Sequence, residues 1–305
     1  MIRFIFYIKR IFLTQTLKAH FMVFIATFLV AGSFIASAKL SGVIDSISLT
    51  LYRFVLAAII LAPVILIKKE YRAKIISTFP RAMIIGLFYS LYFIGMFKAL
   101  ESTTALNTGT LYTLVPLMTG ILCIFFFKEK MNLKQLFIYF IGIVGTCIVV
   151  FKADFELFLG FSLSEGDIIF LLASTSMALY SIFLKLLHKK GDILLVLVFT
   201  TLIGGCFWMF ITMQVLNIPF GWEKIKGDLF YWMSYLVIGT TVVTLYLYQK
   251  SSIILGPKKL MAYVYLSPAM VAILSFIIEK QTISFNVFIG IIISTFATIV
   301  LLKQK

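Results

Sequence analysis

Ten stretches of about twenty predominantly apolar residues follow one another along this chain of 305 residues. An α-helix needs about twenty such residues to cross the roughly 30 Å hydrocarbon core of a bilayer. Hydrophobic residues make up 62% of the chain and charged residues only 13%, which a water-soluble domain could not bury. We therefore predict an all-α integral membrane protein whose transmembrane helices are residues 21–38, 48–67, 82–100, 106–127, 134–151, 168–187, 193–215, 229–249, 260–279 and 285–302.

The distribution of basic residues predicts how these spans are oriented. If the N-terminus is cytoplasmic, 20 of the 27 Lys and Arg residues fall in inner segments and 6 in outer loops, with Arg53 inside the second span. Cytoplasmic loops are enriched in Lys and Arg, so both termini are expected in the cytoplasm. Loops that face anionic lipid also account for the net charge of +15, so no nucleic-acid partner is predicted. Residues 1–20 read as an amphipathic lead-in on the cytoplasmic face.

The two halves of the chain repeat each other. A shift of 152 positions aligns Lys98 with Lys250 and Pro116 with Pro268. Because each half holds five spans, an odd number, the second half must be inverted relative to the first. We expect two inverted five-helix repeats, at residues 21–151 and 167–302. Such repeats are typical of secondary transporters that bind substrate near the midplane, although apolar helices also resemble one another by chance.

Several segments carry a family resemblance. Residues 105–150 and 255–302 each show a helix with a central proline, a short turn thirteen residues later, and a glycine-spaced helix. The first copy places Pro116, Glu129 and Gly145 in this pattern. The second has Pro268 and Gly290, but Gln281 replaces the acidic residue. The openings of the repeats, AGSFIASAKL with TLYRF and GDIIFLLASTSMALYSIFLK, fit as well.

From about residue 20 onward, the chain resembles the EamA-type transporters of the drug/metabolite transporter superfamily. The resemblance implies ten helices and alternating access, without a particular substrate. Members export amino acids or drugs, and others import cofactors. We expect export of an amino acid or related metabolite across a bacterial inner membrane. Import of a cofactor or nucleoside-like metabolite such as S-adenosylmethionine is the alternative.

Polar side chains near the middle of the spans are the candidate substrate ligands. In the resembled family, the first, third, fourth, sixth, eighth and ninth helices surround the cavity. Tyrosine offers both an apolar ring and a hydroxyl to a ligand. Alternatively, Ser and Thr bond their own helix backbone. The candidates are Ser33, Tyr89, Tyr92, Tyr112, Ser174, Tyr180, Thr241, Thr244 and Tyr265.

A second group of residues is predicted to shape or gate the cavity. Pro116 and Pro268 are expected to kink two matching helices. Lys98 and Lys250 close two helices on opposite faces and could pair as gate charges or snorkel. For Arg53, snorkelling to the outer interface is favoured over a functional role. We expect Glu129 to cap the turn or pair with a neighbouring lysine.

Other function classes find less support. No Asp or Glu occupies the middle of a predicted span, so a carboxylate proton relay is not expected. The two histidines, His20 and His188, lie in basic segments, and the three cysteines lie in apolar runs. No metal, cofactor or catalytic activity is predicted. A membrane scaffold or enzyme subunit remains the alternative of another class. The expected partners are a small-molecule substrate and the lipid bilayer.

Overall fold

The computed structural model describes residues 2–103, 105–152, 154–160, 163–279 and 283–303, and within them every regular element is a helix. The first half contains α1 (Ile2–Leu40), α2 (Ser46–Ile67), α3 (Lys69–Ala99), α4 (Ala105–Tyr112), α5 (Val115–Phe127), α6 (Leu133–Val150) and α7 (Phe155–Leu159). The second contains α8 (Glu165–Leu187), α9 (Leu194–Leu216), η1 (Trp222–Lys224), α10 (Asp228–Val237), η2 (Ile238–Val243), α11 (Thr244–Leu255), α12 (Pro257–Ala262), η3 (Tyr263–Leu266), α13 (Ser267–Glu279) and α14 (Phe285–Lys303).

The expected ten-helix membrane architecture is confirmed. Nine helical segments of the described chain are long and apolar enough to cross a bilayer. One of them combines α4 with α5, and another combines α10, η2 and α11. The remaining expected span, residues 260–279, consists of α12, η3 and α13, which follow one another directly, so that a 3-10 turn separates the two α-helical parts.

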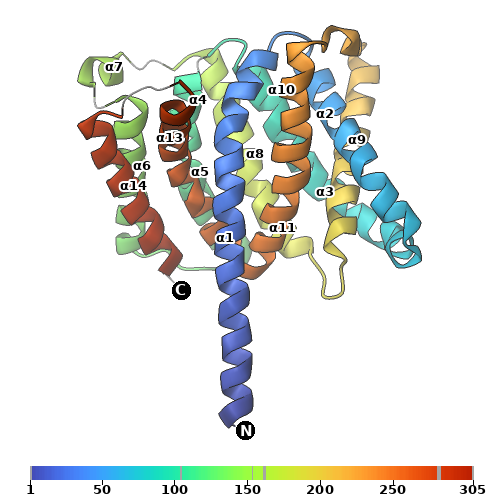
Figure 1. Ribbon diagram of the computed structural model, residues 1–305, viewed down its shortest axis with the longest axis horizontal. Coiled ribbons are helices and arrows are strands. Elements are labelled where there is room, and N and C mark those ends of the chain that lie inside the picture. The colour runs from blue at the N-terminus through green and yellow to red at the C-terminus, as the bar shows by residue number, and fades with distance from the viewer. Residues whose placement is uncertain (1, 104, 153, 161–162, 280–282, 304–305) are drawn as a thin grey trace.

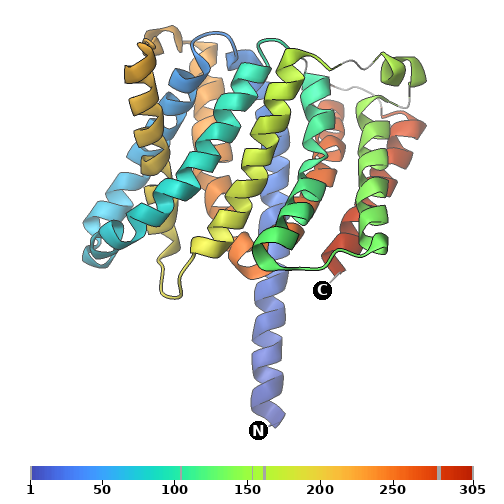
Figure 2. The same ribbon diagram turned by 180° about the vertical axis from the view of Figure 1, so that it is seen from behind.

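The element boundaries confirm the repeat. α5 and α13 have the same length and begin 152 positions apart, and α6 and α14 also begin 152 positions apart. The packing follows the same symmetry. α2 packs against its counterpart α9, and α6 against its counterpart α14. α3 contacts α8, and their repeat counterparts α11 and α1 also contact each other. In the same way α5 contacts α8, and their counterparts α13 and α1 are in contact. Figures 1 and 2 show the bundle with the α6–α14 pair at one end and the α2–α9 pair at the other.

Two helices extend beyond the predicted spans. α1 continues without a break from residue 2, and its first half projects from the bundle (Figure 1). No proline or glycine interrupts the sequence before Gly32, so nothing separates a lead-in at residue 20 from the span. α3 begins at Lys69, so most of the cytoplasmic loop expected before residue 82 is helical. The sequence-based boundaries followed the apolar runs, and these two helices continue beyond those runs.

Apolar side chains fall into two groups, one buried and one exposed. One buried cluster fills the centre of the bundle, and a smaller one lies around Tyr139 and Tyr265. Large apolar side chains also cover the outside, including Phe125 on α5 and Phe137 on α6. An exposed apolar surface of this extent is incompatible with water and is satisfied by lipid.

Candidate functional site

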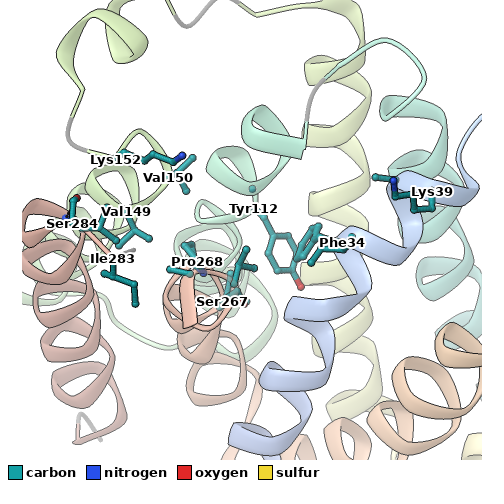
Figure 3. Close-up of a pocket in the computed structure, with 17 residues that line it drawn as sticks. Phe34, Lys39, Tyr112, Val149, Val150, Lys152, Ser267, Pro268, Ile283 and Ser284 are labelled. Atoms are coloured by element: carbon teal, nitrogen blue, oxygen red, sulfur yellow. Dashed lines mark hydrogen bonds between the residues drawn. The ribbon is translucent and has the colours of Figure 1, made fainter. Parts of the chain in front are cut away.

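A cavity of about 670 Å³ lies between α1, α4, α6, α13 and α14. Figure 3 shows Phe34 and Tyr112 near its centre, with Lys39 and Lys152 on either side. The lining residues are Phe34, Ile35, Ala38, Lys39, Gly109, Tyr112, Val149, Val150, Lys152, Val264, Ser267, Pro268, Val271, Ala272, Ile283, Ser284 and Val287. The volume is within the usual range for small-molecule sites.

The cavity lies beside two matching helix breaks. α4 ends at Tyr112, and α5 begins at Val115 with Pro116 in its first turn. In the other half, the 3-10 turn η3 precedes α13, which begins at Ser267 with Pro268 next. Proline fits the first turn of a helix because its missing N–H needs no partner there. The structure thus places Pro116 and Pro268 at breaks rather than at bends within continuous helices.

The lining is mainly apolar, with a lysine on either side. Among the described lining residues there is no Asp or Glu, whereas Lys39 and Lys152 supply two ammonium groups. Ser267 and Ser284 add hydroxyls. Such a surface suits a ligand with an apolar body and an anionic or hydrogen-bond-accepting group.

Behind Tyr112, aromatic rings fill the middle of the bundle. The ring of Tyr112 lies 5.7 Å from Phe34 and 5.9 Å from Tyr92. Tyr92 lies 4.9 Å from Phe93, which also contacts Tyr89 at 4.9 Å. The structure therefore brings together the predicted residues Tyr89, Tyr92 and Tyr112, and Tyr180 joins them at 4.9 Å from Tyr89. Tyr112 alone of these four lines the cavity.

Arg53 lies within this aromatic group, contrary to the expectation that it snorkels. Its side chain has no exposed surface, and the guanidinium carbon lies 4.2 Å above the Phe93 ring. Nε donates to the Thr241 hydroxyl at 2.5 Å. Nη2 donates to both the carbonyl and the hydroxyl of Thr240 at 2.9 Å. Both threonines belong to η2, a π-helical turn of the other half, so Arg53 joins the two repeats.

Two other predicted ligands, Ser33 and Thr244, donate to backbone carbonyls, whereas Ser174 does not. The Ser33 hydroxyl donates to the Val30 carbonyl at 2.7 Å, and Thr244 donates to the Thr240 carbonyl at 2.7 Å. Ser174 is fully buried, and its hydroxyl has no hydrogen-bond partner among the described residues.

Tyr265 is not part of the group. Its hydroxyl donates to the Tyr139 carbonyl at 3.0 Å, and its ring packs against Gly142 of α6. It therefore supports the contact between the second half and α6, apart from the cavity and the aromatic group.

The two candidate gate lysines do not lie on the cavity. Lys98 is exposed and pairs with Glu101 of the same helix end at 2.6 Å. Lys250 lies 5.6 Å from the Tyr246 ring. A different ion pair links the halves, because Glu129 binds Lys258 of α12 at 2.5 Å rather than a neighbouring lysine. Gln281, the repeat counterpart of Glu129, lies outside the described residues.

Sequence reasoning missed three features of the site. Lys39 and Lys152 were treated only as loop charges, although each follows an apolar span that lines the cavity. Gln249 is fully buried, its amide donates to Thr201 at 3.3 Å, and its Oε1 has no partner among the described residues. A polar residue inside an apolar run was the available signal for Gln249.

Comparison with known proteins agrees with this architecture. A model of the EamA-like transporter family matches residues 17–151 and 164–303. The uncharacterised transporter YyaM of Bacillus subtilis (strain 168) is 27% identical over 250 residues, which are 77% of this chain and 78% of that protein. A crystal structure described only as that of a protein has a TM-score of 0.65 at 18% identity, covering 93% of this chain and 96% of that one. The latter similarity bears on the fold alone.

Proposed function

The chain belongs to the EamA-like transporter family, and from this premise we propose that it is a secondary transporter that moves a small metabolite by alternating access. One observation carries the proposal: the cavity lies beside the two breaks that the halves place at matching positions. Broken helices at the interface of inverted repeats are the usual location of transporter substrate sites. Among the described residues that line the cavity there is no His, Cys, Asp or Glu, which supports a transport role rather than catalysis.

The proposed substrate is an amino acid or a related metabolite, with export as the direction. Its apolar part would contact the aliphatic lining and its carboxylate would be attracted by Lys39 and Lys152. The runner-up is import of a cofactor or nucleoside-like compound. The edge-to-face pair of Phe34 and Tyr112 favours it, because aromatic side chains also pack well against planar rings.

The proposed location is a bacterial inner membrane with both termini in the cytoplasm. The excess of Lys and Arg in the inner segments supports this orientation. Both termini lie at the same end of the bundle in Figure 1. Lys39 lies in the last turn of α1, and Lys152 lies two residues after the end of α6. In this orientation both lysines are therefore on the outer side of the membrane.

Counterflow in proteoliposomes tests the proposal. Vesicles are preloaded with a pool of amino acids, nucleosides and S-adenosylmethionine, and uptake of each labelled compound is followed. We expect one label to accumulate, and Tyr112→Ala to reduce its uptake because this ring lines the cavity. Tyr231→Ala is the matched control, since Tyr231 is exposed on the outer surface of α10. Absence of counterflow from folded protein with every compound would contradict the proposal.

A further inference from the structure

Arg53 is a positive charge in the middle of the protein with no negative partner. It is fully buried, and no carboxylate of the described residues forms an ion pair with it. Its hydrogen-bond partners are the neutral groups of Thr240 and Thr241, and Phe93 lies under its face. A buried charge without a counter-ion is unfavourable and inside a membrane protein marks a functional position.

The guanidinium is only partly satisfied. Arginine has five N–H donors, and those of Nε and Nη2 are directed at the two threonines. Nη1 is buried and has no hydrogen-bond partner among the described residues. Two donors on a fixed cation therefore remain for an acceptor that none of the described residues supplies. An anionic acceptor such as a carboxylate binds such donors through strong, charge-assisted hydrogen bonds.

A path of aromatic side chains connects these donors with the cavity. Tyr112 lines the cavity and contacts Tyr92, which contacts Phe93 beneath the guanidinium. All three rings are buried, so they separate the cavity from Arg53 in this conformation. The side chains that hold Arg53 come from a π-helical turn, an irregularity that is frequent at functional sites.

We propose that Arg53 is the anion subsite of the transport site and that its Nη1 group donates to the carboxylate of the substrate. This inference rests on the proposed function and narrows the substrate class to carboxylates. The ligand enters at the cavity, where Lys39 and Lys152 attract it, and reaches Arg53 once the rings of Tyr112 and Tyr92 have moved. The bound carboxylate then neutralises the buried charge inside the bundle.

Thermal unfolding of the purified chain in detergent tests the subsite with defined probes. L-phenylalanine and L-leucine are compared with their amides, which retain the amine and side chain but lack the negative charge. We expect at least one acid to raise Tm by about 2–4 °C when present well above its Kd, and its amide to leave Tm unchanged. Sodium chloride at the same concentration is the control for a small inorganic anion.

Variants assign the effect to the guanidinium. Arg53→Gln should abolish the shift caused by the acid, Arg53→Lys should weaken it at least tenfold in Kd, and Arg72→Gln on the exposed face of α3 should leave it intact. The unliganded Tm reports whether each variant folds. If the variants do not fold, the difference in Tm shift between acid and amide on the native chain tests the subsite. Any of four results would overturn the subsite. These are equal Tm shifts by acid and amide, a Tm shift by chloride alone, a Tm shift by the acid that is retained in folded Arg53→Gln, and no Tm shift by either acid.

The test of the Arg53 subsite and the test of transport can fail independently of each other. Counterflow of a compound without a carboxylate would leave the transporter standing and remove the subsite. Conversely, acid binding that depends on Arg53 without any counterflow would support the subsite and contradict transport.

Discussion

At the residue scale, two glycines set the distance between α6 and α14. A Cβ atom on Gly145 would lie 2.6 Å from the Ser294 amide nitrogen, and one on Gly290 would lie 2.8 Å from the Gly145 carbonyl. Because backbone atoms cannot move aside easily, we expect Gly145→Ala to destabilise the protein by about 1–3 kcal/mol. Thermal unfolding in detergent should show a Tm lower by about 2–6 °C.

Gly239→Ala is the matched control for this substitution. The nearest atom to a Cβ there is 3.4 Å away, on the ring of Tyr235, which is ordinary contact. Its Tm should stay within about 1 °C of the native value. If both variants unfold at the native temperature, α6 and α14 are less closely packed than the backbone distances indicate.

A pH response is expected at His188, which follows the end of α8. Burial lowers the pKa of His188 below its ordinary value of 6.5, and the charges of Lys185 and Arg81 act in the same direction, against that of Asp192. The unfolded chain therefore binds more protons than the folded one below about pH 6.5, so stability should fall as the pH drops from there toward the lowered pKa. We expect Tm to fall by about 1–3 °C between pH 7 and 5.5.

Substitution of His188 isolates this contribution. His188→Gln should show a smaller fall in Tm over the same pH range. Asp192 does not interfere, because hydrogen bonds from Arg81 and the Lys189 amide outweigh burial and lower its pKa below 3.8. Its stabilising contribution is present above that value and is lost only as the pH falls through the lowered pKa. An unchanged slope in His188→Gln would contradict the assignment.

Single residues were predictable from sequence to different degrees. A tyrosine at midspan was enough to select Tyr112, Tyr92 and Tyr89, which lie together in the structure. The depth of Arg53 was not predictable, because its partners are almost 190 positions away, in the other half. The same reason applies to Tyr265, whose partner on α6 has no signature in a single helix.

At the element scale, the two helix breaks should matter more for transport than for folding. Pro116 and Pro268 begin helices beside the cavity, where the proposed alternating access would require the backbone to bend. With Pro116→Ala, the segments α4 and α5 can join into a straighter helix, because alanine supplies the missing N–H and favours helix. We expect the initial rate of counterflow to fall by about tenfold, equivalent to about 1.4 kcal/mol on the barrier.

Pro63→Ala serves as the control at the same scale. Pro63 lies inside α2 on an exposed face and has no counterpart in the repeat. Its replacement should leave the rate within about twofold of the native chain. Equal rates for the native chain and Pro116→Ala would show that the break is not used in transport.

The elements themselves were largely encoded in local sequence. Lipid selects apolar runs of about twenty residues, so the number of spans and the 152-position repeat could be read directly. Sequence could not show that α3 extends back to Lys69, since a helix continues beyond the membrane without an apolar signal. Nor did a proline alone show that two turn residues separate α4 from α5, or that a 3-10 turn directly precedes α13.

At the scale of the whole molecule, the two faces of the bundle differ. The cavity with its two lysines lies toward the face opposite the termini, whereas the Glu129–Lys258 ion pair joins α12 to the end of α5 on the side of the termini. The repeat does not reproduce this pair, because the positions corresponding to Glu129 and Lys258 are Gln281 and Leu106. The pair therefore favours closure on the side of the termini only.

Breaking this pair should shift the conformational equilibrium away from the state in which the cavity is open on the face opposite the termini. A cysteine reporter, Val271→Cys on the cavity wall, is placed in a background without Cys123, Cys147 and Cys206. It is labelled from the side opposite the termini with a membrane-impermeant maleimide. A partly exposed ion pair is worth up to about 1 kcal/mol, so Glu129→Gln should slow labelling by up to about fivefold.

Lys98→Gln provides the comparison, since it breaks an exposed ion pair within one half and should leave the labelling rate unchanged. A rate in Glu129→Gln that equals or exceeds that of the parent would mean that closure on the side of the termini depends on helix packing rather than on charge. In that case the asymmetry between Glu129 and Gln281 would have no role in setting which face is open. Slower labelling confined to Glu129→Gln would instead assign the conformational preference of the whole bundle to one ion pair between its halves.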